Sequence, residues 1–368
     1  MTDGEHPQTE VTIHRTAVIW LAVFLILIGI LWLLKGILLP FVAGFALAYL
    51  LDPLADRLAR AGMGRTLAAL VILCGFTLLA VLMIATMAPL LVDQFQQFMR
   101  DMPGYIERVS GVFTEQLGWL RNLLGGRLGS LEGSAGEIVS SAGSWLATAL
   151  GGLWAGGAAL MSVVGLFVVT PVVAFYMLVD WDRMVSTVDS WLPRQNRDTI
   201  RMLARDMNRA VAGFVRGQAV VCMLLGAMYA VGLTLVGLNF GLLIGLGAGI
   251  VSFIPYVGTI TGFLVAAGVA IAQFWPDFMS IGAVFLVFGL GQFVEGNILQ
   301  PNLVGRQVGL HPVWLMFALF AFGSLFGFVG VLLAVPLAAA IGVLMRFAVA
   351  RYKESVLYRG PEPETPET

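Results

Sequence analysis

The residues best suited to chemistry form a polar island inside an otherwise apolar part of the chain. Glu295 is a titratable carboxylate, and the amides that follow it can both donate and accept hydrogen bonds. Gly296 and Pro301 weaken a helix here, so the backbone is predicted to leave the helix and offer its carbonyls and amides to a solute. The predicted residues of this solute path or gate are Gln292, Glu295, Asn297, Gln300, Pro301 and Asn302. The alternative is a cytoplasmic loop that begins with a helix-end carboxylate.

A second interruption lies upstream, in the sequence Phe253-Ile-Pro-Tyr-Val-Gly258. Pro255, Tyr256 and Gly258 break the helical pattern and leave backbone groups without partners, which lipid does not supply. We predict a re-entrant tip or hinge here that meets the polar island in three dimensions and lines the same path. The alternative is a plain turn in which Tyr256 is an interfacial aromatic residue.

Arginines recur at steps of three or four residues after the fourth apolar run. This spacing places them on one side of a helix, with apolar side chains on the opposite side. We predict a contact with anionic lipid or with another domain, and the alternative is a substrate site. The residues concerned are Arg194, Arg197, Arg201, Arg205 and Arg209. Gln218 follows in the next apolar run, where a lone amide often bonds only to a neighbouring helix.

No enzyme signature is present in the sequence. The phosphate-binding run of ATPases and the H-E-x-x-H metal motif are absent, and we expect no catalytic residues, no metal and no cofactor. The two cysteines lie in apolar segments and are interpreted as small hydrophobic residues. The net charge of -1 gives no indication of nucleic-acid binding.

Composition places the chain among membrane proteins. Hydrophobic residues make up 59% of the sequence and charged residues only 12%, against about 25% charged in soluble proteins. The pattern predicts an all-α fold, a polytopic integral membrane helical bundle of about eight spans with re-entrant segments and an external helical insert.

The apolar runs divide the chain into seven regions. Lys35-Gly36 separates two spans, because residues 17–51 as one helix would be about 50 Å long against a hydrocarbon core of about 30 Å. Asp52-Pro53 is expected to end the second span. An amphipathic pattern follows the third span and is expected to break at Pro103-Gly104. The regions are a cytoplasmic segment (1–16), spans one to three (17–91), the external insert (92–156), span four (157–180), an Arg-rich interfacial helix (181–216), a membrane core with broken helices (217–349) and a disordered cytoplasmic tail (350–368).

Charge asymmetry predicts the orientation. The loops at 52–65 and 180–216 and the C-terminal tail are basic, whereas acidic and basic residues are nearly equal in number in the insert. The basic segments and both termini are therefore expected in the cytoplasm. Residues 238–349 must then cross an odd number of times. They contain five apolar pieces, Phe240–Ile254, Val257–Trp275, Phe278–Val294, roughly Val313–Gly327 and Phe328–Val349. Several of these are too short for a full span, so three crossings and one re-entrant pair, eight spans in all, are favoured over ten spans.

Several of these segments resemble a known family of bacterial membrane proteins, the autoinducer-2 exporter family. The resemblance runs in order over residues 17–350, and its strongest motifs include the two predicted breaks. It implies a permease of the bacterial cytoplasmic membrane with about eight helices, cytoplasmic termini and a homo-oligomeric assembly. Some members of that family are linked to export of autoinducer-2 and others to sodium or lithium–proton antiport. The motifs are Phe45-Ala-Leu-Ala-Tyr-Leu-Leu-Asp-Pro53, Pro171-Val-Val-Ala-Phe-Tyr-Met-Leu-Val-Asp180, Gly249-Ile-Val-Ser-Phe-Ile-Pro-Tyr-Val-Gly258, Phe293-Val-Glu-Gly-Asn-Ile-Leu-Gln-Pro-Asn-Leu-Val-Gly305, Val308-Gly-Leu-His-Pro312 and Phe326-Gly-Phe-Val-Gly-Val-Leu-Leu-Ala-Val-Pro-Leu337.

Three functions are compatible with these patterns. The first is transport of a small polar solute, for which autoinducer-2-like molecules are one class. The second is antiport of a monovalent cation against protons, which needs a titratable carboxylate inside the membrane; Glu295, Asp180 and Asp277 are the candidates, and all lie near span ends. The third is a scaffold without transport, which binds lipids or partners through the insert and the Arg-rich helix.

Overall fold

The computed structural model describes residues 28–124, 157–305 and 311–359, together with Ala22 and Ile26. This part of the chain is built from helices and contains no strand, and seven of its helical segments are long and apolar enough to cross a membrane. The prediction of an all-α membrane bundle is confirmed. The elements are η1 (Lys35–Ile37), α2 (Leu38–Arg60), α3 (Arg65–Leu124), α5 (Gly157–Ser190), η2 (Arg194–Asn196), α6 (Arg197–Leu235), α7 (Gly241–Val251), α8 (Val257–Phe274), α9 (Phe278–Val294), η3 (Glu295–Gly305), α11 (Pro312–Glu354) and α12 (Val356–Arg359).

The predicted turn between the first two spans is present at Lys35, but the helix after it is longer than expected, and most of the first predicted span lies outside the described residues. The short 3-10 turn η1 begins at Lys35 and leads into α2. α2 then continues through Pro53 to Arg60, so the expected end at Asp52-Pro53 is wrong. Ala55 is fully buried beyond the proline, and this packing keeps the chain helical. Only residues 61–64 connect α2 to α3, instead of a loop over 52–65.

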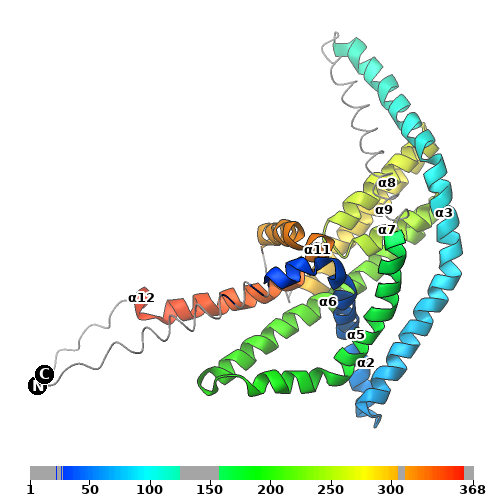
Figure 1. Ribbon diagram of the computed structural model, residues 1–368. Coiled ribbons are helices and arrows are strands. Elements are labelled where there is room, and N and C mark those ends of the chain that lie inside the picture. Colours follow the sequence, from blue (N-terminus) through cyan, green and yellow to red (C-terminus); the bar gives the residue numbers. More distant parts are fainter. Residues whose placement is uncertain (1–21, 23–25, 27, 125–156, 306–310, 360–368) are drawn as a thin grey trace, which may run out of the picture.

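α3 is one helix of 60 residues, about 90 Å long at 1.5 Å per residue. It joins the predicted third span to the first part of the predicted insert, and the expected break at Pro103-Gly104 is wrong. Phe98 and Met102, before the proline, are buried in the core cluster, and Tyr105 and Ile106, after it, pack against the same cluster. These contacts hold the helix on both sides of Pro103. Figure 1 shows α3 running along one side of the molecule past α7, α8 and α9. The rest of the insert, residues 125–156, lies outside the described residues.

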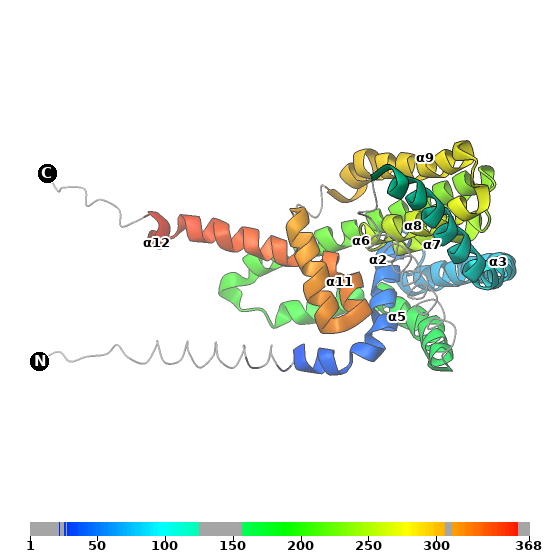
Figure 2. The same cartoon turned by 90° about the horizontal axis from the view of Figure 1, so that it is seen from above.

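Two separate clusters of buried residues define two packed units. The N-terminal unit consists of α2, the first part of α3 and α5, and its cluster includes Ala48, Ala55 and Leu178. The core unit is built around α6 and includes α7, α8, α9, η3 and part of α11, with Tyr229 and Phe288 stacked at its centre. Both views show α5 beside α2 and α7 beside α8 (Figures 1 and 2).

Glycines allow α6 and α7 to pack at very short range. A Cβ atom on Gly249 would lie 2.3 Å from the Cα of Gly226, and one on Gly245 would lie 2.4 Å from the Cα of Ala230. No side chain fits at either position. Small residues are the usual means by which membrane helices approach closely, because lipid provides no hydrophobic drive for helix association.

Two helix breaks shape the last third of the chain. α7 has 11 residues and is about 16 Å long, too short to cross the hydrocarbon core, and the chain reverses at Tyr256 (φ 67°) into α8. α11 consists of two helices separated at Gly327 (φ 62°, ψ -140°). Their packing through Ala318 and Ala334 shows that the second half folds back on the first. The sequence predicted both interruptions.

Candidate functional site

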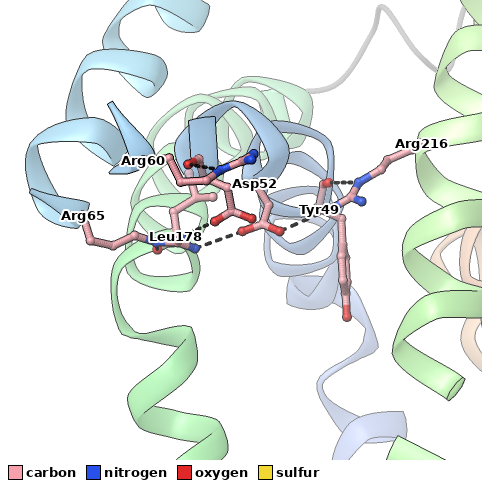
Figure 3. A network of polar contacts seen from close by, with 7 residues as sticks. Tyr49, Asp52, Arg60, Arg65, Leu178 and Arg216 are labelled. Carbon is pink, nitrogen blue, oxygen red and sulfur yellow. Dashed lines mark hydrogen bonds and ion pairs between the residues drawn. The ribbon is translucent and has the colours of Figure 1, made fainter. Parts of the chain in front are cut away.

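Asp52 of α2 is the centre of a polar network that joins the two units (Figure 3). Its carboxylate lies 3.0 Å from a guanidinium nitrogen of Arg65 in α3 and 3.3 Å from one of Arg216 in α6. Arg216 also donates its Nε–H to the backbone carbonyl of Tyr49, at 2.7 Å. Arg65 pairs with Asp56 as well, and donates to the carbonyl of Leu178 in α5 at 2.9 Å. One carboxylate therefore connects both units.

The link between the units is polar and partly exposed. The side chains of Asp52 and Arg216 are 36% and 38% exposed, so solvent screens their attraction. Pairs of this kind contribute about 0–1 kcal/mol. Tyr49 adds a hydrogen bond from its hydroxyl to Oδ1 of Asn208 in α6, at 2.8 Å. These contacts can hold the units together and can also separate at modest cost.

A cavity of about 700 Å³ lies between the two units, next to this network. α2 and α5 form one side of it, and α6 and the end of η3 form the other. Its polar wall residues are Tyr49, Asp52, Trp181, Arg205, Asn208, Arg209, Arg216 and Asn302. The rings of Tyr49 and Trp181 meet edge to face, with centroids 6.3 Å apart. The cavity can hold a small molecule and offers it charged, amide and aromatic contacts.

Glu295 is buried in the core unit, with 5% of its surface exposed. The hydroxyl of Thr259, in the first turn of α8, donates to its Oε2 at 3.1 Å. The structure therefore brings the polar island against the α7–α8 turn, as expected from their shared character. A buried carboxylate within a membrane protein is a candidate functional residue.

The polar island is helical, so the expected departure of its backbone from a helix is wrong. Residues Glu295–Gly305 form a π-helix, η3, a wider turn that is often found at functional sites. The Asn297 side chain donates to the carbonyl of Phe293 at 3.0 Å, and Asn302 donates to that of Ile298 at 2.7 Å. These amides satisfy carbonyls of their own helix, which is why the segment does not open into a loop.

The predicted path residues do not all meet at one place. Glu295 and Gly258 are buried in the core, whereas Gln292, Asn297 and Pro301 are exposed. Gln300 is half-buried and Pro255 is buried, while Tyr256 is 47% exposed. Asn302 alone among them lies on the cavity wall. The set therefore divides between a buried cluster around Glu295 and the surface of η3.

Further buried polar groups surround the α7–α8 turn. The amide of Gln218 in α6 donates to the carbonyl of Ser252 at 2.6 Å, which confirms its expected bond to a neighbouring helix. A Cβ atom on Gly258 would lie 2.4 Å from the Ser252 hydroxyl oxygen, so only glycine fits there. The oxygen of the Gln218 side chain is buried without a hydrogen-bond partner among the described residues. A buried polar atom without a partner is costly, so this part of the core is polar beyond what the helix contacts alone require.

The predicted Arg stripe divides into two parts. Arg201 and Arg197 both donate to Asp189 at the end of α5, with Arg201 Nε 2.6 Å from the carboxylate. These hydrogen bonds, that of Arg201 foremost, hold the pKa of the Asp189 carboxyl, which lies beyond the apolar part of α5, below its usual range. Arg205 and Arg209 line the cavity, and Arg194 lies in η2.

Sequence reasoning missed several residues of the site. Tyr49 and Asp52 lie inside the motif Phe45–Pro53, and that motif was the signal that could have identified them. Arg216 was not predicted, although it stands two residues before Gln218. Thr259 gave no signal, because a threonine inside an apolar helix is common and its partner Glu295 lies 36 residues away.

Comparison with known proteins agrees with this architecture. The model of the AI-2E family transporter matches residues 21–350. The chain is 30% identical over 321 residues to the "Putative transport protein YrrI" of Bacillus subtilis, which covers 85% of this chain and 87% of that protein. It is also 30% identical over 317 residues to the "Putative permease PerM" of Escherichia coli, covering 85% of this chain and 88% of that one. The chain, a multi-pass membrane protein, therefore belongs to the AI-2E transporter family.

Proposed function

We propose that this transporter moves a small polar solute through the cavity between its two units. The main support for this proposal is the cavity, which is lined by α2 and α5 on one side and by α6 and η3 on the other. A site placed between two separately packed units can be opened to either side when one unit rotates against the other. The fold and the family support a transport function, and the size and polar wall of the cavity support a small polar molecule as the solute.

The contacts across the cavity are suited to such a movement. Arg216 holds both the Asp52 carboxylate and the Tyr49 carbonyl, and Tyr49 bonds to Asn208. These bonds must break for α2 to move away from α6. Exposed pairs cost little to separate, whereas the buried clusters within each unit remain intact. In this proposal the bonds form the gate on the side of the Arg-rich helix.

Glu295 favours a second candidate function, antiport of a monovalent cation against protons. The carboxylate is buried, and within the described part of the chain its one hydrogen-bond donor is the Thr259 hydroxyl. Burying an unpaired charge is expensive, so a bound monovalent cation would stabilise the carboxylate in the core. A carboxylate and a hydroxyl oxygen are both ligands for small hard cations. In solute transport the same residue would couple flux to protons.

Flux into liposomes tests both functions. The purified chain is reconstituted and assayed with furanosyl diols and with sodium or lithium, each with and without an imposed proton gradient. We expect solute flux from the wild-type protein. The Glu295→Gln variant should lose gradient-driven accumulation but retain exchange, because it keeps the shape of the side chain and removes its charge. Asp277→Asn is the matched control, since this exposed carboxylate caps α9 away from the cluster.

The outcomes separate the three candidate functions. Cation flux that depends on Glu295, without solute flux, would establish the antiport reading. Absence of any flux from folded protein would favour a scaffold and contradict the proposal. If gradient-driven flux is equal in the wild-type protein and in Glu295→Gln, the Glu295 carboxylate does not couple flux to the proton gradient.

We also propose a location in the bacterial cytoplasmic membrane, with both termini in the cytoplasm. The Arg-rich start of α6 and the basic end of α11 support a cytoplasmic placement, and the far end of α3 would then be external. Gly111 lies in that part of α3, and no atom lies within 4 Å of its Cβ position. In a variant without Cys74 and Cys222, Gly111→Cys should react with an impermeant maleimide added outside. Reaction only after the inner face is exposed would reverse the orientation.

A further inference from the structure

The cavity wall between α2, α5, α6 and η3 has a marked excess of positive charge. Among the described residues that line it, Arg205, Arg209 and Arg216 carry a guanidinium group and Asp52 alone carries a carboxylate. We propose that the cavity binds a small organic anion, a carboxylate or a phosphate monoester attached to a compact apolar body. This inference rests on the proposed function, because it names the class of solute that the same cavity takes.

The carboxylate in the wall is already neutralised by the protein. Asp52 contacts both Arg216 and Arg65, and Arg65 is not a wall residue of the cavity. A cationic solute would therefore find its counter-charge occupied by two guanidinium groups. Charges that remain after internal pairing decide which solute is attracted, and here they are positive.

Arg205 is the cation best placed to receive a solute. Its Nε–H donates to the carbonyl of Arg201 at 3.2 Å, one turn earlier on α6. In the described part of the chain no carboxylate forms an ion pair with it. Its two terminal nitrogens can therefore form paired hydrogen bonds with a carboxylate or phosphate group, the geometry for which a guanidinium is suited. Arg209 differs, because Asp206 lies 3.1 Å from it.

The rest of the wall fits an organic molecule better than an inorganic ion. Tyr49 and Trp181 present two aromatic rings, and Phe45 and Met177 add apolar surface. Asn208 of α6 and Asn302 of η3 supply amides from the side of the cavity that faces α2 and α5. An inorganic anion needs none of the aromatic surface, whereas an apolar body with a single anionic group uses both kinds of contact.

Three probes of matched shape test the charge preference in the full-length chain. Isothermal titration in detergent at low salt would measure the binding of 4-hydroxybenzoate, 4-hydroxybenzamide and protonated 4-hydroxybenzylamine. We expect the benzoate to bind at least tenfold more tightly than the other two, and its affinity to fall as sodium chloride is added. Arg205→Gln should weaken benzoate binding about tenfold or more and leave amide binding unchanged, because charge-assisted hydrogen bonds are lost.

Arg183→Gln is the matched control. It removes the same charge from α5 two residues after Trp181, but Arg183 is not a wall residue, so benzoate affinity should stay within twofold of the wild-type value. Equal or tighter binding of the ammonium or amide probe would overturn the inference, as would unchanged benzoate affinity in Arg205→Gln. Absence of saturable benzoate binding by folded wild-type protein would overturn it as well.

The binding and flux experiments test the anion class and the transport function separately. Flux of neutral or cationic solutes without benzoate binding would retain the transport function and reject the anion class. Benzoate binding that depends on Arg205, from a protein that transports nothing in liposomes, would retain the anion site and reject the transport function.

Discussion

The core unit and the N-terminal unit are held together by different physical means. In the core, α6 and α7 are in backbone contact at Gly226 and Gly249, and aromatic rings stack at its centre. The N-terminal unit has a smaller buried cluster and is joined to α6 through Asp52, Tyr49 and Arg216. Close packing resists deformation, whereas partly solvated ion pairs exchange readily. The core is thus suited to stay rigid while the N-terminal unit moves.

The largest effect is expected from a change inside the core. Gly249→Ala places a methyl group 2.3 Å from the Cα of Gly226, so α6 and α7 must separate. Overpacking of this kind costs about 1–3 kcal/mol or more. Thermal unfolding in detergent should show a clear loss of stability for this variant.

Gly247→Ala is the control for that experiment. It lies on the same helix, and no atom lies within 4 Å of its Cβ position. Its melting temperature should equal or slightly exceed that of the wild-type protein, since alanine favours helix over glycine. Equal destabilisation by both variants would show that α7 is not the rigid contact described above.

A moderate effect is expected at the link between the units. Asp52→Asn removes the charge that Arg65 and Arg216 share, so the cavity should open more often. In a background without Cys74 and Cys222, a cysteine at Gly213, on the cavity wall, should react with maleimide about two- to fivefold faster, in line with a pair worth up to about 1 kcal/mol. The melting temperature should change less than in Gly249→Ala.

Asp56→Asn separates this effect from general loss of charge. Asp56 pairs with Arg65 but does not touch Arg216, so the link to α6 remains. The cysteine at Gly213 should then react at close to the wild-type rate. A rate in Asp52→Asn no higher than in Asp56→Asn would show that Asp52 does not hold the cavity closed.

The smallest effect is expected at Asp189, which ties α5 to α6 through Arg201 and Arg197. Because these hydrogen bonds lower the pKa of its carboxyl in the folded protein, its contribution to stability is present above the ordinary Asp pKa of about 3.9 and is lost as pH falls below it. The difference in melting temperature between wild type and Asp189→Asn should be small and constant from pH 8 to pH 5. This difference in melting temperature should shrink below about pH 4. A difference that grows on acidification would show that the hydrogen bonds from Arg201 and Arg197 to Asp189 do not stabilise the fold.

The apolar helices and the breaks near Pro255 and Gly327 could be predicted, whereas the breaks expected at Pro53 and Pro103 are absent and the partners of the helices could not be predicted. The lengths of the apolar runs predicted the spans, and the residues around Pro255 and Gly327 predicted the interruptions. Both features depend on residues that are close together in the sequence. The polar island was located correctly, but its π-helical form was not, because the Asn side chains that satisfy its carbonyls act through geometry that spacing does not reveal. The Asp52–Arg216 pair joins residues 164 positions apart, and no local pattern encodes such a contact.

The length of α3 has a mechanical consequence. Arg65, its first residue, belongs to the Asp52 network, and Phe98, 33 residues further on, packs edge to face on Phe240 at the start of α7. About 50 Å of unbroken helix separates these two contacts. Such a rod transmits a tilt as a displacement at its far end, so a small rotation at Asp52 would become a sliding movement against Phe240. α3 would in this way couple a movement at the Asp52 network to the start of α7.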